Sequence, residues 1–116
     1  MRLVQVKDET RGTLIGDRVV VADTTLSRMF GLLPKKGLNA GEGLWITPSS
    51  GVHTFGMRFT IDVIGLDKHR RVIKLWPDLV PFRITSVSIK LRSVVELPGG
   101  RIRDCGVQLG DTISIE

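Results

Sequence analysis

The sequence has few of the features that would point directly to a function. It contains a single cysteine, Cys105, so no disulfide can form within the chain. It has no tyrosine, and aromatic residues make up only 5% of it, which leaves few side chains on which nucleic-acid bases could stack. No apolar run approaches the roughly 18 residues that a membrane-spanning helix needs. These absences argue against a disulfide-rich scaffold, a base-stacking protein and a transmembrane protein.

The N-terminal segment does not have the pattern of an export signal. Lys7, Asp8 and Glu9 interrupt the apolar run before it could form the core of a signal peptide. We therefore expect a cytoplasmic protein with no membrane partner.

What the sequence does contain is typical of a small β domain. It has 116 residues, a hydrophobic fraction of 41%, 13 glycines and 5 prolines, as expected for short strands joined by tight turns. About eight such strands are recognisable. Among them are residues 61–66, 72–75, 86–92 and 94–97, and Gly16-Asp17 predicts a two-residue hairpin turn between residues 13–15 and 18–22. The sequence thus predicts a mainly β, compact, sandwich-like or barrel-like single domain over residues 1–116.

One segment has the period of a helix instead. Its apolar residues are spaced at i, i+3, i+4 and i+7, as on one face of a helix, namely Leu26, Met29, Phe30 and Leu33. Pro34 would end the helix at the residue before it. We expect one short helix near residues 24–33, with its apolar face packed on the β core.

The charge balance is basic but scattered. The formal net charge is +5, yet only residues 68–71, Lys-His-Arg-Arg, form a run, and this run lies where a hairpin turn is expected. No nucleic-acid-binding motif accompanies it. Nucleic-acid binding through scattered basic residues is therefore kept only as a second alternative.

Two acidic residues lie inside apolar strands. Asp62 falls between Ile61 and Val63, and Glu96 falls between Val95 and Leu97. A buried carboxylate has to be paired or hydrogen-bonded. We therefore expect at least one of the two to form a structural ion pair with Arg28 or Arg58, or to accept bonds from backbone N–H groups. Acids in such surroundings also occur in functional sites.

The segment that ends at Asp62 holds most of the remaining polar candidates. A histidine, a hydroxyl, a methionine and an arginine occur within a few positions, and Gly56 among them predicts a bulge. We expect a shallow polar pocket beside Trp45 or Trp76 whose candidate residues are His53, Thr54, Met57, Arg58, Asp62 and Glu96. No metal-ligand spacing and no cofactor motif is present, so neither a metal nor a cofactor is predicted.

Several motifs taken together resemble a known family. They are TTLSRMFGLL, GEGLWITPSSGVHTFGMRFTIDVIGLD and VVELPGGRIRDCGVQLGDTISI, which cover roughly residues 10–116. This order and spacing is similar to that of the domain-of-unknown-function family 192. The resemblance implies a compact, mainly β, sandwich-like domain with no established activity. Many relatives carry a cysteine near Ser49, which this chain lacks, so no redox or metal role is carried over to that position.

Three kinds of function remain open on the sequence alone. The leading hypothesis is a non-enzymatic β domain that binds a small molecule or a protein partner. The first alternative is an enzyme whose site combines His53, Asp62 and Glu96 and acts on a small polar substrate. Nucleic-acid binding is the second alternative.

Overall fold

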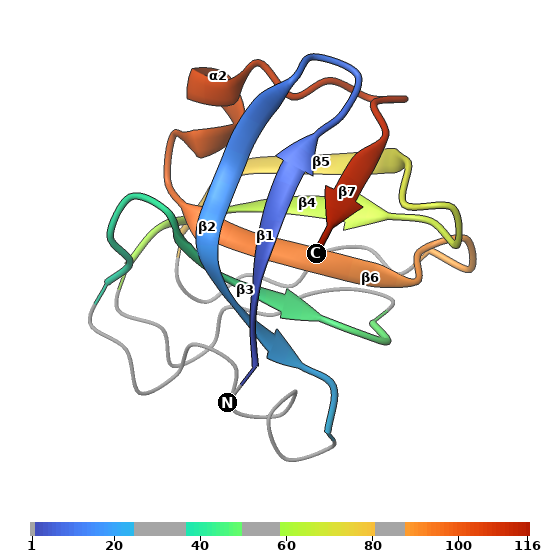
Figure 1. The fold of residues 1–116 in the computed structure, drawn as a ribbon, viewed down its shortest axis with the longest axis horizontal. Coiled ribbons are helices and arrows are strands. Elements are labelled where there is room, and N and C mark those ends of the chain that lie inside the picture. The colour runs from blue at the N-terminus through green and yellow to red at the C-terminus, as the bar shows by residue number, and fades with distance from the viewer. Residues whose placement is uncertain (1, 25–36, 50–58, 81–87) are drawn as a thin grey trace.

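The fold is a single curled sheet. The computed structural model describes residues 2–24, 37–49, 59–80 and 88–116. Their strands form a seven-stranded sheet in the order β5-β4-β6-β3-β2-β1-β7 (Figure 1). The pairing of β2 with β3 is parallel and the other pairings are antiparallel. The strands are β1 (Leu3–Asp8), β2 (Thr13–Ala22), β3 (Glu42–Ile46), β4 (Ile61–Leu66), β5 (Val72–Leu79), β6 (Ser93–Pro98) and β7 (Ile113–Ile115).

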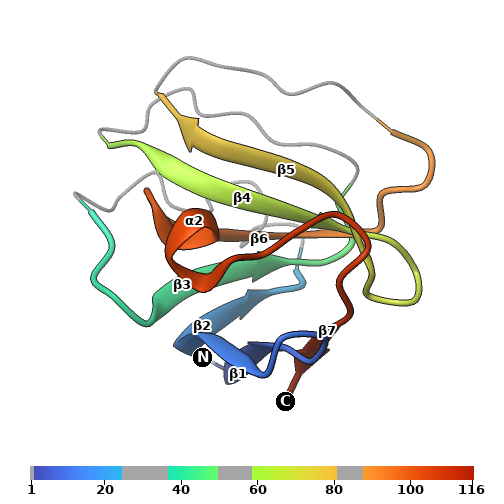
Figure 2. The same cartoon turned by 90° about the horizontal axis from the view of Figure 1, so that it is seen from above.

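The two edges of the sheet meet at one end. The backbone N–H of Val72, at the start of β5, donates to the carbonyl of Asp111 at 2.8 Å, and the N–H of Ile113 in β7 donates to the carbonyl of Arg70 at 2.9 Å. These bonds join the edge strands and curl the sheet into a half-barrel, which Figure 2 shows from above. The mainly β, barrel-like fold expected from the sequence is confirmed.

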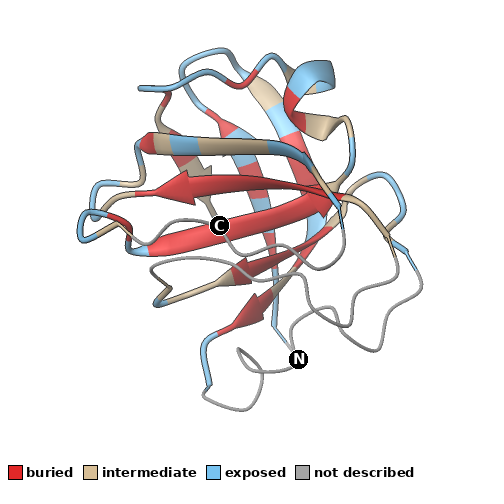
Figure 3. Cartoon of the chain, turned by 180° about the vertical axis from the view of Figure 1, so that it is seen from behind, coloured by how far each residue is buried: buried red, intermediate tan, exposed pale blue. Residues whose placement is uncertain are grey.

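The sheet buries apolar side chains on both faces. The inner face, turned into the curl, carries residues from every strand, including Val6, Val19, Trp45, Ile64, Val95 and Leu97. The outer face carries a second cluster centred on Ala22, Leu44, Ile61, Val63, Leu91 and Val94. The central strands β4 and β6 are therefore buried along nearly their whole length (Figure 3), because apolar residues stand on both sides of them.

A short helix lies at one end of the half-barrel. Helix α2 (Arg101–Cys105) contacts β2, β4 and β5 and places Ile102 in the inner cluster. The sequence did not indicate it, because five residues with one buried apolar side chain carry no measurable period. The helix expected near residues 24–33 falls outside the described residues.

Three details of the expected strands are wrong. Strand β2 runs through Gly16-Asp17 without a turn, because the N–H groups of Asp17 and Arg18 both donate to the carbonyl of Gly41, next to β3. Strand β5 continues past Pro77 to Leu79, which is possible since β5 is an edge strand and needs fewer ladder donors. Residues 88–92, expected to belong to a strand, instead include a turn before β6.

Within the described ranges, no helix is long and apolar enough to cross a membrane.

Candidate functional site

Glu96 stands in the middle of the outer face. It lies on β6, where its cross-strand partners are Leu44 on β3 and Val63 on β4. Val63 is in turn paired with Trp76 on β5. Because directly paired residues of neighbouring strands point to the same face, these four side chains form a row across the sheet. Glu96 is the only ionisable member of this row.

The carboxyl group of Glu96 is buried without compensation from the described residues. The residue is 4% exposed. Among residues that the structure describes, none is recorded in a hydrogen bond or ion pair with its side chain. Desolvation by burial raises the pKa of Glu96 from an ordinary 4.5 to about 7. Near neutral pH this group therefore exists in both its protonated and its ionised form.

Asp62 is also buried but, unlike Glu96, both of its carboxylate oxygens accept hydrogen bonds from described residues. One oxygen, Oδ1, accepts the backbone N–H groups of Asp78 at 2.9 Å and Gly100 at 3.0 Å, and Oδ2 accepts that of Ile102 at 2.7 Å. These donors belong to the end of β5, the turn before α2 and the first turn of α2. The backbone of Asp78 is strained, since a non-glycine residue has φ 52° there, whereas Gly100 adopts its φ of 88° without a Cβ clash. Asp62 thus fastens α2 and the end of β5 to β4.

The two acids do not face each other. Asp62 is paired with Leu97, which belongs to the inner cluster, whereas Glu96 is paired with Val63 of the outer cluster. Their side chains therefore leave opposite faces of the sheet. Asp62 and Glu96 therefore do not share one pocket or one enzyme site, and the hypothesis that combined these two acids is wrong. The expected burial of both is confirmed.

Of the other candidates from the sequence, the structure places only the two tryptophans. His53, Thr54, Met57 and Arg58, as well as Arg28, lie outside the described residues. Of the two tryptophans, Trp76 lies on the outer face in the row of Glu96. Trp45 lies on the inner face, where the guanidinium carbon of Arg70 is 5.0 Å from the centre of its ring. Trp76 is therefore the tryptophan that could border a pocket containing Glu96.

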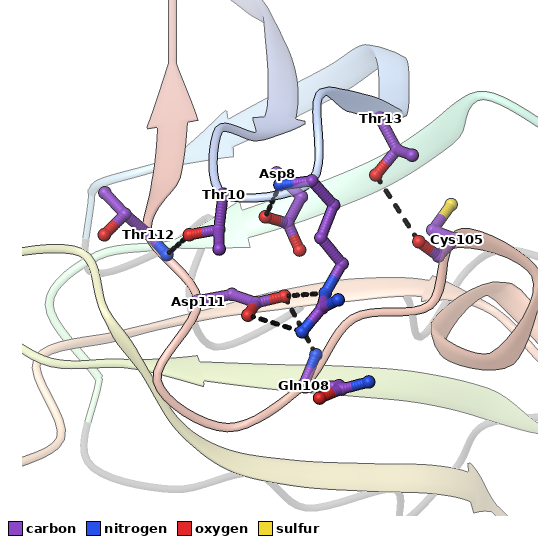
Figure 4. A network of polar contacts seen from close by, with 8 residues as sticks. Asp8, Thr10, Thr13, Cys105, Gln108, Asp111 and Thr112 are labelled. Carbon is purple, nitrogen blue, oxygen red and sulfur yellow. Dashed lines mark hydrogen bonds and ion pairs between the residues drawn. The ribbon is translucent and has the colours of Figure 1, made fainter.

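A third buried acid closes the half-barrel. Arg11 binds Asp111 through two contacts, Nε to Oδ2 at 2.8 Å and Nη2 to Oδ1 at 3.2 Å (Figure 4). Its backbone N–H donates to Asp8 Oδ1 at 3.2 Å. Asp111 also accepts the backbone N–H of Gln108 at 3.0 Å. This clamp joins the β1–β2 turn to the segment before β7, and sequence reasoning missed it because its members are about a hundred residues apart.

The two carboxyl groups of the clamp differ in their affinity for a proton. Burial raises the pKa of Asp8 to about 6, and a hydrogen bond with the Asp111 carboxyl group adds to this rise. Asp8 Oδ2 is buried and has no partner while it is ionised, but a proton on it can be shared with Asp111. The pKa of Asp111 is lowered: burial opposes this, but the bonds from Asp8, Arg11 and Gln108 outweigh it. Arg11 and Asp111 thus form a charged pair, with Asp8 as the titrating neighbour.

Metal binding gains no support from these acids. Among the residues the structure describes, no three His, Cys, Asp or Glu side chains are grouped so as to hold a metal ion.

Comparison with known proteins relates nearly the whole chain to a family of uncharacterised proteins. Residues 4–115 match the model of the DUF192 family, described as "Uncharacterized ACR". The chain is 34% identical over 112 residues to a UPF0127 protein of Thermococcus gammatolerans, covering 92% of this chain and 72% of that protein. It is 30% identical over 113 residues to a UPF0127 protein of Pyrococcus horikoshii, covering 93% of this chain and 96% of that one.

The fold also has a solved counterpart. A protein of unknown function from Novosphingobium aromaticivorans superposes with a TM-score of 0.82 at 23% sequence identity, over 97% of this chain and 83% of that one. This likeness establishes the shared fold alone.

Proposed function

Because this chain belongs to the DUF192 family, whose description names no activity, we propose a function from its own geometry: it is a non-enzymatic module that binds a small ligand at the outer face of the sheet. Glu96 is the polar anchor of the site. The row of Leu44, Val63 and Trp76 supplies the apolar surface. His53, Thr54, Met57 and Arg58, expected to share this pocket, stay a prediction.

The observation that supports this proposal is that the carboxyl group of Glu96 is buried while the described residues offer it no hydrogen bond or ion pair. Burying a carboxyl group among apolar side chains costs several kcal/mol unless it is neutralised or paired. Asp62 shows that the same fold can satisfy a buried acid completely with backbone donors. Glu96 has no such donors among the described residues, and a buried acid with a raised pKa is a feature of binding sites, where a ligand can supply the missing partner.

The chemistry of the face indicates the class of ligand. An ionised Glu96 attracts a cation, and apolar neighbours favour an apolar body next to that charge. The indole of Trp76 can add a cation–π contact. A small amine with an apolar body matches all three features, whereas a simple anion would be repelled.

Benzylamine and benzyl alcohol are a matched pair of probes, since they share the ring and differ in charge. At pH 8, above the pKa of Glu96 of about 7, Glu96 is mostly ionised. We expect the amine to bind at least tenfold more tightly than the alcohol there, by calorimetry or NMR titration. At pH 5 the preference should largely disappear, because Glu96 is then protonated.

Two variants separate the site from general charge effects. Glu96→Gln should remove the preference for the amine, and Glu9→Gln, which neutralises an exposed acid, should keep it. Equal binding of both probes by the unmodified protein, or an unchanged preference in Glu96→Gln, would overturn the proposal, as would binding of neither probe.

The cytoplasmic location expected from the sequence stays a prediction, to be tested by cell fractionation.

A further inference from the structure

A cavity of the opposite charge lies between the turn that follows β4 and the turn that precedes β6. It measures about 370 Å³ and is lined by Asp67, Lys68, His69, Ile89, Lys90 and Arg92. Its two sides come from the β4–β5 hairpin turn and from the turn that precedes β6. In the sequence the basic residues of 68–69 and of 90–92 are two of several scattered groups. The fold brings these two groups together.

We propose that this cavity binds a phosphate group of a small phosphorylated molecule. The cations Lys68, Lys90 and Arg92 and the imidazole of His69 supply the donors. The exposed side chain of Ile89 offers an apolar contact for the organic part of such a molecule.

Both walls of the cavity are held by their own hydrogen bonds. In the hairpin turn, Asp67 Oδ1 accepts the N–H groups of His69 at 2.8 Å and Arg71 at 2.9 Å. The second wall is fixed to the first, because the N–H of Arg92 donates to the carbonyl of Leu66 at 2.9 Å. The positions from which the basic side chains extend are thus set before any ligand arrives, which lowers the entropic cost of binding.

The second wall has its own turn. The N–H of Leu91 donates to the carbonyl of Ser88 at 3.2 Å, and the guanidinium of Arg92 donates to the carbonyl of Ile89. This turn projects Ile89, which is 89% exposed, beside Lys90.

No cation of the cavity forms an ion pair in the described part of the chain, although one nitrogen of the Arg92 guanidinium donates to the carbonyl groups of Ile89 and Leu91. The ion pairs recorded there join Arg11 to Asp111, Arg18 to Asp17 and Arg103 to Asp104, and none includes a cation of this cavity. The one acid of the lining, Asp67, already accepts two backbone bonds. Three fixed positive charges against one engaged carboxylate leave an excess of donors, which suits a multiply charged anion.

The size of the cavity favours a compact anion over an extended polymer. A volume of about 370 Å³ is within the range of small-molecule sites. A nucleic acid would need basic side chains along a groove that follows several phosphates. Here the cations instead gather around one hollow, so we place a single phosphorylated group there.

Inorganic pyrophosphate is the probe for this site. In a ¹⁵N-amide NMR titration at low salt, we expect shifts confined to residues 67–69 and 89–92. The double variant Lys68→Gln/Lys90→Gln should bind pyrophosphate at least tenfold more weakly. The single variant Lys7→Gln, which removes an exposed charge on β1, should stay within twofold of the unmodified protein. Thermal melting should show that all these variants keep the fold, since the changed side chains are exposed.

Two further binding measurements, with lipid vesicles and with single-stranded DNA, identify the kind of molecule that carries the phosphate group. Pyrophosphate binding with no sedimentation on phosphatidylglycerol vesicles supports a soluble ligand. Sedimentation that pyrophosphate reverses supports the same cavity with a lipid headgroup as its ligand. Tight binding of single-stranded DNA that pyrophosphate does not reverse would overturn the proposal, as would equal weakening by Lys7→Gln or the absence of pyrophosphate binding. The Glu96→Gln variant should bind pyrophosphate normally, so this site and the amine site can fail independently.

Discussion

Asp62 and Glu96 lie on neighbouring central strands, are both nearly inaccessible to solvent, and are treated by the fold in opposite ways. Asp62 receives three backbone N–H bonds on the inner side. Glu96 receives none from the described residues on the outer side, and its pKa rises to about 7. The difference shows that burial alone does not reveal the role of an acid. An acid whose bonds are complete holds structure together, whereas one whose bonds are open is a candidate for binding.

The largest effect is expected from removing the satisfied acid. Asp62→Ala leaves three N–H donors without their acceptor, at Asp78, at Gly100 and in the first turn of α2. Since each stranded buried donor costs about 1–3 kcal/mol and relaxation recovers part of it, we expect a loss of about 4 kcal/mol. Urea unfolding at pH 7 measures it. A loss below about 1 kcal/mol would mean that Asp62 is not the fastening described here.

The opposite behaviour is expected at Glu96. Between its ordinary pKa of 4.5 and its folded pKa of about 7, the folded protein holds a proton that the unfolded chain has released. The contribution of Glu96 to the free energy of unfolding is therefore complete below pH 4.5 and is lost as the pH rises through 7. A shift of this size corresponds to about 3 kcal/mol.

Glu96→Gln makes this contribution measurable. The variant should be about as stable as the unmodified protein at pH 4 and more stable by up to about 3 kcal/mol at pH 8, in urea unfolding at both values. Glu9→Gln, at an exposed acid, should show no such gain in stability between pH 4 and pH 8. If Glu96→Gln is less stable at pH 8, then Glu96 has a structural partner and the contrast with Asp62 disappears.

The sequence revealed part of this contrast and could not reveal the rest. The apolar residues on both faces of the segment around Asp62, and on both sides of Glu96, were enough to predict that the two acids are buried. This pattern could not show that they face opposite sides, because that depends on the pairing of Val63 with Glu96, which is a property of two strands. For the same reason, no local pattern could join Asp8 to Asp111, or residues 67–69 to residues 89–92.

A smaller effect should show how closely the outer face is packed near the row of Glu96. A methyl group on Gly65 would lie 2.7 Å from Leu91 Cδ1, 3.0 Å from Lys74 Cβ and 3.2 Å from Trp76 Cζ3. Gly65→Ala should therefore destabilise by about 2 kcal/mol through overpacking. Gly37→Ala is the matched control, since its methyl group would meet nothing within 4 Å. Equal stabilities of the two variants in urea would show that the face around Trp76 adapts freely.

The smallest effect concerns Asp8, which is intermediate between the other two acids because one of its oxygens is bonded and the other is not. Burial is the main reason that its pKa reaches about 6, and the hydrogen bond and the charge of Asp111 add to the rise. Asp111→Asn removes that charge while the burial stays, so the pKa of Asp8 should fall but remain above its ordinary 3.8. Carboxyl ¹³C NMR titration measures this directly, with Asp104→Asn on α2 as the control that leaves Asp8 unchanged. A pKa of Asp8 that stays the same or rises in Asp111→Asn would show that the two carboxyl groups do not share a proton, and Asp8 would then belong with Glu96 as an acid shifted by burial alone.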